Sequence, residues 1–117
     1  MMHRFGLSVD SAMDGNEAVN LVRKRVESDN STYKLILMDY SMPNCNGSDA
    51  TKQIRMFLFS QAPHLQQPFI CCVMSYVERS YQQEVLEAGM NGFLTRPVFQ
   101  AGIKRLLAKA NINSESE

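Results

Sequence analysis

The 117-residue sequence has no net charge, no long apolar run and no cysteine pair of the C-x-x-C type. Its 12 Lys and Arg balance its 12 Asp and Glu, so no overall field draws the chain to nucleic acid or to an anionic membrane. No apolar run approaches the roughly 20 residues of a membrane helix, and the N-terminus lacks the apolar stretch of a secretion signal. We therefore expect a soluble chain that does not bind polyanions through bulk charge.

Cysteine is scarce, with only Cys45, Cys71 and Cys72. The number is odd, and two adjacent cysteines do not easily close an unstrained disulfide. This pattern favours a reducing compartment, and we expect the chain to be cytoplasmic. Cys71 and Cys72 lie inside an apolar run, so we interpret them as small buried hydrophobes and not as a redox or zinc site.

The composition is that of one ordinary domain, with 44% hydrophobic and 21% charged residues. A chain of this length buries a single core without further help. We expect the domain to span residues 1–110 and residues 111–117 to form a polar tail that frays.

Three apolar runs without alternation predict strands buried on both faces, as in a parallel sheet covered by helices. They are LILMD (residues 35–39), FICCVM (69–74) and GFLT (92–95), and LSVDSA (7–12) is a weaker strand candidate. Between the runs, apolar residues recur at helical spacing. The expected buried stripes are Val19, Val22 and Val26, then Ala50, Ile54 and Phe57 or Leu58, and finally Ile103, Leu106 and Leu107 in a helix over 99–110.

A further helix is expected over residues 77–88, with Gly89 as its C-terminal stop. Strands and helices thus alternate along the chain, which indicates right-handed crossovers. The sequence predicts an α/β fold in which an open parallel sheet carries helices on both faces.

Polar residues follow three of the predicted strands. Asp39 ends the run 35–39, Ser75 follows 69–74, and Arg96 with Pro97 follows 92–95. The carboxyl ends of parallel strands meet at one edge of a sheet, where ligands bind. A carboxylate, a hydroxyl and a guanidinium at such an edge favour phosphoryl chemistry, as nucleophile or metal ligand, hydrogen-bond donor and neutralising cation.

Three segments carry a family resemblance. DYSMPNCNG (39–47) resembles the D-x-x-M-P-x-x-x-G signature of response-regulator receiver domains in two-component phosphorelays, DGNEAV (14–19) is similar to the start of the family's second helix, and residues 71–98 resemble its last strands. LEAGMNGFLTRPV (86–98) further resembles receivers attached to hybrid histidine kinases. The resemblance implies the family's flavodoxin-like fold, with strand order 2-1-3-4-5.

The resemblance also implies a role for each matching residue. Asp39 would accept a phosphoryl group from a phosphohistidine on a histidine kinase or a histidine phosphotransfer domain. Ser75 would hydrogen-bond that group, and Phe93 would be the aromatic switch that follows the hydroxyl. Arg96 and Pro97 would be joined by a cis peptide bond.

Magnesium is the cofactor that the resemblance implies. Ser41 would offer its backbone carbonyl and Asp39 its carboxylate. The family's first strand ends in an acidic pair that holds the metal, and this sequence begins after that strand, so we expect a domain incomplete at its N-terminus that binds magnesium weakly. Asp10 and Asp14 match a later part of the family and do not replace the pair.

A second departure is Arg96, which stands where the family has lysine. Arginine keeps the charge but is longer, planar and bidentate. We expect it to pair with the phosphate in a shifted geometry.

Three alternatives to a working phosphoacceptor stay open. The chain could be a degenerate receiver that serves as a docking module without phosphorylation. An aspartyl phosphohydrolase is disfavoured because position 41, two beyond Asp39, is serine and not a second aspartate, so we expect no turnover enzyme. If the chain is a fragment, unpaired strand edges predict a homodimer or aggregation.

Overall fold

The structure is a computed structural model that describes residues 14–41 and 46–109. The strand candidate at 7–12, Cys45 and the tail at 111–117 lie outside the described residues. The elements are α1 (Gly15–Asp29), β1 (Leu35–Asp39), α2 (Gly47–Gln61), β2 (Phe69–Met74), the 3-10 helix η2 (Val77–Tyr81), α3 (Gln82–Glu87), β3 (Gly92–Thr95) and α4 (Gln100–Lys109). Each of the three predicted strands at 35–39, 69–74 and 92–95 is confirmed.

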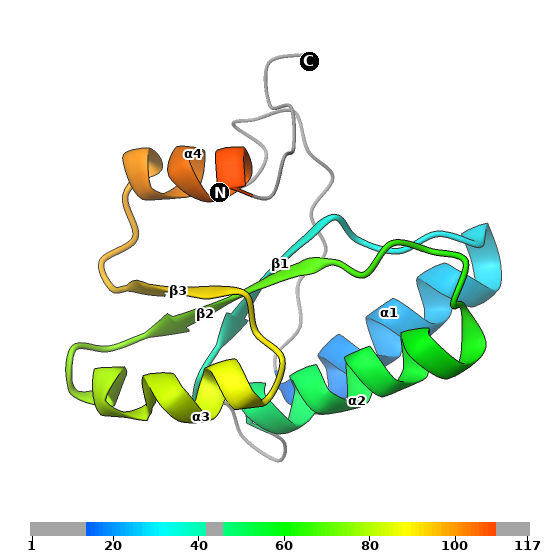
Figure 1. Cartoon of the computed structure of the whole chain (residues 1–117), viewed down its shortest axis with the longest axis horizontal. Helices are drawn as coiled ribbons and strands as arrows, with labels where there is room; N and C mark the ends of the chain where they lie inside the picture. Colours follow the sequence, from blue (N-terminus) through cyan, green and yellow to red (C-terminus); the bar gives the residue numbers. More distant parts are fainter. Residues whose placement is uncertain (1–13, 42–45, 110–117) are drawn as a thin grey trace.

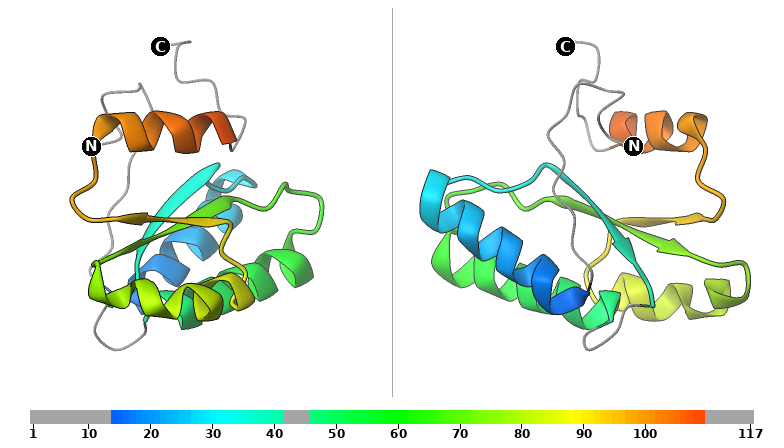
Figure 2. Two further views of the ribbon diagram at one scale, coloured as in Figure 1. Left: turned by 60° about the vertical axis from the view of Figure 1, so that its left-hand side comes forward. Right: turned by 180° about the vertical axis from the view of Figure 1, so that it is seen from behind.

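The strands form one parallel sheet in the order β1-β2-β3. Figures 1 and 2 show α1, α2 and α3 on one face of the sheet and α4 on the other. This arrangement confirms the predicted α/β fold with helices on both faces. Because all three strands are parallel, their carboxyl ends meet at one edge of the sheet.

The core forms around β2, whose side chains are buried on both faces of the sheet. Ile70, Cys72 and Met74 pack under α1 and α2 against Ile54 and Leu58. Cys71 is fully buried as well. Burial raises the pKa of each of the two thiols to about 12, so both cysteines are packed as hydrophobes, as the sequence predicted.

The helical stripes are buried as expected, except that Val26 at the end of the first stripe is only partly buried while Val19 and Val22 are at most 4% exposed. Ile103, Leu106 and Leu107 of α4 are at most 5% exposed. Of the two candidates in α2, Leu58 is the buried residue and Phe57 is only partly buried. The Asp14 side chain caps the start of α1, where it accepts a hydrogen bond from the Glu17 amide.

The helix predicted over 77–88 differs from the observed one. The chain runs through the 3-10 helix η2 before α3, which covers only Gln82–Glu87. Val77 is 80% exposed, so no apolar packing holds the first turn in α-helical geometry. Gly89 has φ of +108° directly after the helical segment, which confirms it as the stop.

The described helices include none that could cross a membrane, since over residues 14–41 and 46–109 none is both long and apolar enough.

Candidate functional site

The carboxyl edge of the sheet brings Asp39 and Arg96 together across the end of β2. Asp39 is the last residue of β1 and pairs in register with Val73. The Tyr40 amide donates to the Val73 carbonyl and the Arg96 amide to the Met74 carbonyl, both at 2.9 Å. Both ladders therefore continue one residue beyond the outer strands, which orients Arg96 toward Asp39.

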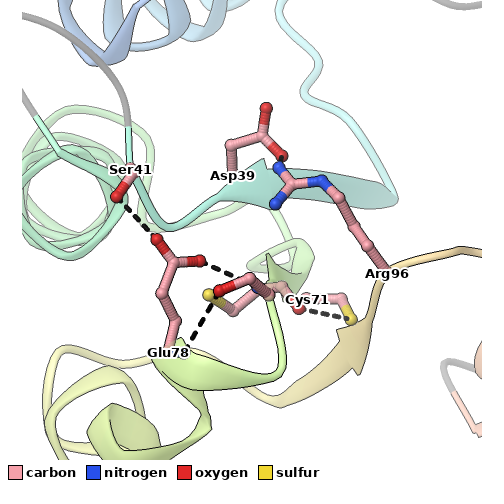
Figure 3. Close-up of polar contacts among 7 residues, drawn as sticks. Asp39, Ser41, Cys71, Glu78 and Arg96 are labelled. Carbon is pink, nitrogen blue, oxygen red and sulfur yellow. Dashed lines mark hydrogen bonds and ion pairs between the residues drawn. The ribbon is translucent and has the colours of Figure 1, made fainter.

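Arg96 and Asp39 form an ion pair in which Nη2 of Arg96 donates to Oδ1 of Asp39. Figure 3 shows the two side chains pointing at each other from β1 and from the residue after β3. The Arg96 side chain is 47% exposed and that of Asp39 49%. An exposed ion pair contributes only about 0–1 kcal/mol to stability. The carboxylate is accordingly open to an incoming group while a cation stands beside it.

Ser75 is engaged with Glu78. The Ser75 amide donates to Oε1 of Glu78 at 2.8 Å, and the Glu78 amide donates to Oγ of Ser75 at 3.2 Å. This reciprocal pair is a capping box. Glu78 is not among the residues predicted for the site, although the Ser-x-x-Glu spacing of residues 75–78 is the local signal for it.

Ser41 joins the same carboxylate from the loop after β1. Its hydroxyl donates to Oε2 of Glu78 at 2.7 Å, as Figure 3 shows. The hydrogen bond from the Ser75 backbone, followed by that from the Ser41 hydroxyl, lowers the pKa of Glu78. Glu78 is therefore an ionised acceptor that links the loops after β1 and β2.

Tyr40, next to Asp39, ties the same edge to α3. Its hydroxyl donates to Oε2 of Glu84 at 2.8 Å, and the Ser48 hydroxyl donates to the same oxygen at 3.2 Å. The Tyr40 ring stacks on Tyr81 with centroids 5.3 Å apart. Burial, and then the hydrogen bond to Glu84, raises the pKa of Tyr40 to about 12. No motif in the sequence links these residues, which lie about 40 positions apart.

Two other predicted site residues, Phe93 and Pro97, lie on either side of Arg96 in the sequence. Phe93 is partly buried on β3 and packs against the core under α1 and α2. The Arg96–Pro97 peptide bond is cis, the conformation that the family resemblance implies. The roles of Phe93 as a switch and of the Ser41 carbonyl as a metal ligand stay predictions.

The donor set for a metal is small. Within residues 14–41 and 46–109, no group of three or more His, Cys, Asp or Glu side chains is placed to hold a metal ion. Asp39 offers one carboxylate, and the remaining ligands of a magnesium ion would come from backbone, water and phosphate oxygens.

Comparisons with known proteins relate the whole described fold to one family. The model of the response regulator receiver domain matches residues 1–110. The chain is 34% identical over 102 residues to the osmosensing histidine protein kinase SLN1 of Saccharomyces cerevisiae, which covers 87% of this chain and 8% of SLN1. It is 31% identical over 111 residues to two-component response regulator 24 of Arabidopsis thaliana, covering 95% of this chain and 71% of that protein. The chain thus spans less than a tenth of SLN1 and most of the plant regulator.

Solved structures show the same similarity. The receiver domain of sensor histidine kinase PA1611 from Pseudomonas aeruginosa, with magnesium coordinated in its active site cleft, superposes with a TM-score of 0.73 at 25% identity, covering 94% of this chain and 82% of that one. The receiver domain of Ssk1, crystallised with the histidine phosphotransfer protein Ypd1 of Saccharomyces cerevisiae, gives a TM-score of 0.74 at 26% identity, covering 99% and 80%.

Proposed function

Because the chain belongs to the response-regulator receiver domain family, we propose that it is a phosphoacceptor in phosphorelay signalling and that Asp39 carries the phosphoryl group. The observation that supports this most is the position of Asp39. It ends β1 at the sheet edge where ligands bind, is half exposed, and has a guanidinium as its ion-pair partner.

The reaction at Asp39 is the transfer of one phosphoryl group. A carboxylate oxygen attacks phosphorus, the P–N bond of a phosphohistidine breaks, and the electron pair leaves with the imidazole nitrogen. The product is an aspartyl phosphate. Arg96 shifts from the carboxylate to the new phosphoryl oxygens and offsets their charge, while the Ser75 hydroxyl donates a hydrogen bond to one of them.

Magnesium, when bound, supplies charge neutralisation between Asp39 and the phosphoryl oxygens. Asp39 and the Ser41 carbonyl would hold it. Magnesium commonly keeps several waters and uses only one or two carboxylates, so this donor set fits a weakly bound ion.

The proposed partner is a protein that carries a phosphohistidine, either a histidine kinase or a histidine phosphotransfer domain. The Ssk1 receiver, which this chain resembles, was crystallised with such a phosphotransfer protein. The similarity to part of SLN1 supports a place within a hybrid histidine kinase. Each phosphoryl group is accepted once and passed on or lost, so the chain acts as a relay and not as a turnover enzyme. A homodimer stays a prediction for light scattering to test.

Intact-mass spectrometry after exposure to magnesium and a small acyl phosphate tests the proposal. We expect one added phosphate on the chain and none on Asp39→Asn. Asp29→Asn, an exposed aspartate at the end of α1, is the matched control and should take up phosphate like the parent. A melting curve on each protein shows that all three are folded.

The second candidate is a docking module that is never phosphorylated. It is favoured by the ion pair that engages Oδ1 of Asp39 and by the small donor set for magnesium. A chain that melts cooperatively and takes up no phosphate would favour this second function. The phosphohydrolase alternative lacks a carboxylate at position 41, where the Ser41 hydroxyl binds Glu78.

A further inference from the structure

The Glu78 carboxylate contacts the loops after both β1 and β2. Oε1 accepts from the Ser75 amide at 2.8 Å, and Oε2 accepts from the Ser41 hydroxyl at 2.7 Å. Ser41 lies in the loop after β1, and Ser75 directly follows β2. The Glu78 carboxylate therefore fixes the spacing of these two loops beside Asp39.

Burial does not hold Glu78 in place. Residue 78 is only partly buried, and its neighbour Val77 is 80% exposed. The position of the carboxylate therefore comes from its two hydrogen bonds and from its charge. That charge lies within electrostatic reach of Arg96, the ion-pair partner of Asp39.

The same hydrogen bonds restrain Ser75. Its amide is bound to the Glu78 carboxylate, and its hydroxyl oxygen accepts from the Glu78 amide. A phosphoryl group on Asp39 adds about 1.5 to 2 negative charges at neutral pH, and it competes with the Glu78 carboxylate for the positive charge of Arg96.

We propose that Glu78 is a positioning residue that favours the unphosphorylated site, because its carboxylate ties Ser41 to Ser75 and repels an incoming phosphoryl group. This inference rests on the function proposed above for Asp39. Its consequence is that removal of the Glu78 charge speeds phosphorylation, although Glu78 is not among the groups that react.

Glu78→Gln removes the charge and retains both contacts, because the amide oxygen still accepts from the Ser75 amide and the amide N–H group can donate to the Ser41 hydroxyl oxygen in place of accepting from it. The rate of phosphate incorporation from a small acyl phosphate with magnesium is followed by intact mass. We expect Glu78→Gln to react about threefold faster than the parent at low ionic strength and to approach the parent rate at about 1 M salt. Salt dependence distinguishes the charge effect from a purely structural one.

Two further variants complete the experiment. Ser41→Ala removes one hydrogen bond and keeps the charge, so we expect a smaller increase that salt does not abolish. Glu87→Gln is the matched control, since Glu87 is an exposed glutamate of α3 whose carboxylate accepts from Gln83; its rate should equal that of the parent at every salt concentration.

The outcomes separate this inference from the proposed function. A Glu78→Gln chain that reacts at the parent rate, or more slowly, overturns the inference while leaving Asp39 as the acceptor; a lower melting temperature with an unchanged rate would make Glu78 a structural cap only. A parent without phosphate, or an Asp39→Asn chain with it, overturns the proposed function and this inference with it.

Discussion

At the scale of single residues, the site depends on how Arg96 reaches Asp39. Arg96 follows β3 and Asp39 ends β1, so the side chain spans the end of β2 to form the ion pair. The long arginine side chain can reach across the end of β2 and still offer further N–H donors to a phosphoryl group. Arginine in place of the family's lysine is therefore compatible with a charge-neutralising role.

Arg96→Ala should slow phosphorylation of Asp39 by about tenfold, because a charge-assisted hydrogen bond to the phosphoryl group is lost. Arg96→Lys keeps the charge and should lose less. Stability should change by under about 1 kcal/mol in both variants, since the pair is exposed. Mass-spectrometric time courses beside urea melts check this; an unchanged rate in Arg96→Ala would remove Arg96 from the mechanism.

At the scale of elements, the start of α2 supports the backbone of Asp39. The Gly47 amide donates to the Tyr40 carbonyl at 3.1 Å. A Cβ at Gly47 would overlap the Asp39 carbonyl oxygen and press on Met38 at 3.1 Å. The glycine of the 39–47 signature is thus required by the close approach of helix and strand.

Gly47→Ala should destabilise the fold by about 1–3 kcal/mol, because the Asp39 backbone has to move. Phosphorylation should slow as well, since the acceptor is displaced. Gly102→Ala is the control: its Cβ would meet Leu94 at an ordinary 3.5 Å, and alanine in a helix interior is neutral or stabilising by about 0.5–1 kcal/mol. Chemical denaturation compares the two; equal stabilities would contradict the close-approach argument.

At the scale of the whole molecule, Arg55 closes the edge of the sheet opposite to Asp39. From α2 it donates to the Gly89 carbonyl at 2.7 and 3.0 Å, to the Pro68 carbonyl at 2.8 Å and to Oδ1 of Asn91 at 2.7 Å. Asn91 in turn accepts from the Ile70 amide at 2.8 Å. Burial lowers the pKa of Arg55, and its N–H donors are matched by the Gly89 and Pro68 carbonyls and by the side-chain oxygen of Asn91.

Arg55→Met should lower the free energy of unfolding by about 2–4 kcal/mol, since it removes the Arg55 donors of the partly buried Gly89 and Pro68 hydrogen bonds. Arg55→Lys should be intermediate, because it cannot reproduce the planar fork. Phosphorylation well below the melting temperature should be unaffected, since the two edges are separate. A stable Arg55→Met chain in urea unfolding would show that water replaces Arg55 at no cost.

The strands, most of the helical stripes and the position of Asp39 and Arg96 at one sheet edge could be predicted from the sequence because each has a local signal. An unalternated apolar run marks a strand buried on both faces, and strand ends place Asp39 and Arg96 at one edge. One continuous helix was predicted over 77–88, whereas a 3-10 helix precedes a short α-helix there. Apolar periodicity does not reveal that Val77 stays exposed. At the start of this segment, the reciprocal hydrogen bonds between Ser75 and Glu78 hold the first turn of η2.

The sequence by itself determined the fold class and the meeting of Asp39 and Arg96 at one edge of the sheet, since apolar periodicity and the order of strands restrict the topology of a chain to very few solutions. Only the tertiary structure decided the contacts between distant segments. The links of Ser41 to Glu78 and of Tyr40 to Glu84 span 37 and 44 positions. Such hydrogen bonds form only after the sheet has brought the loops together, so no local pattern encodes them.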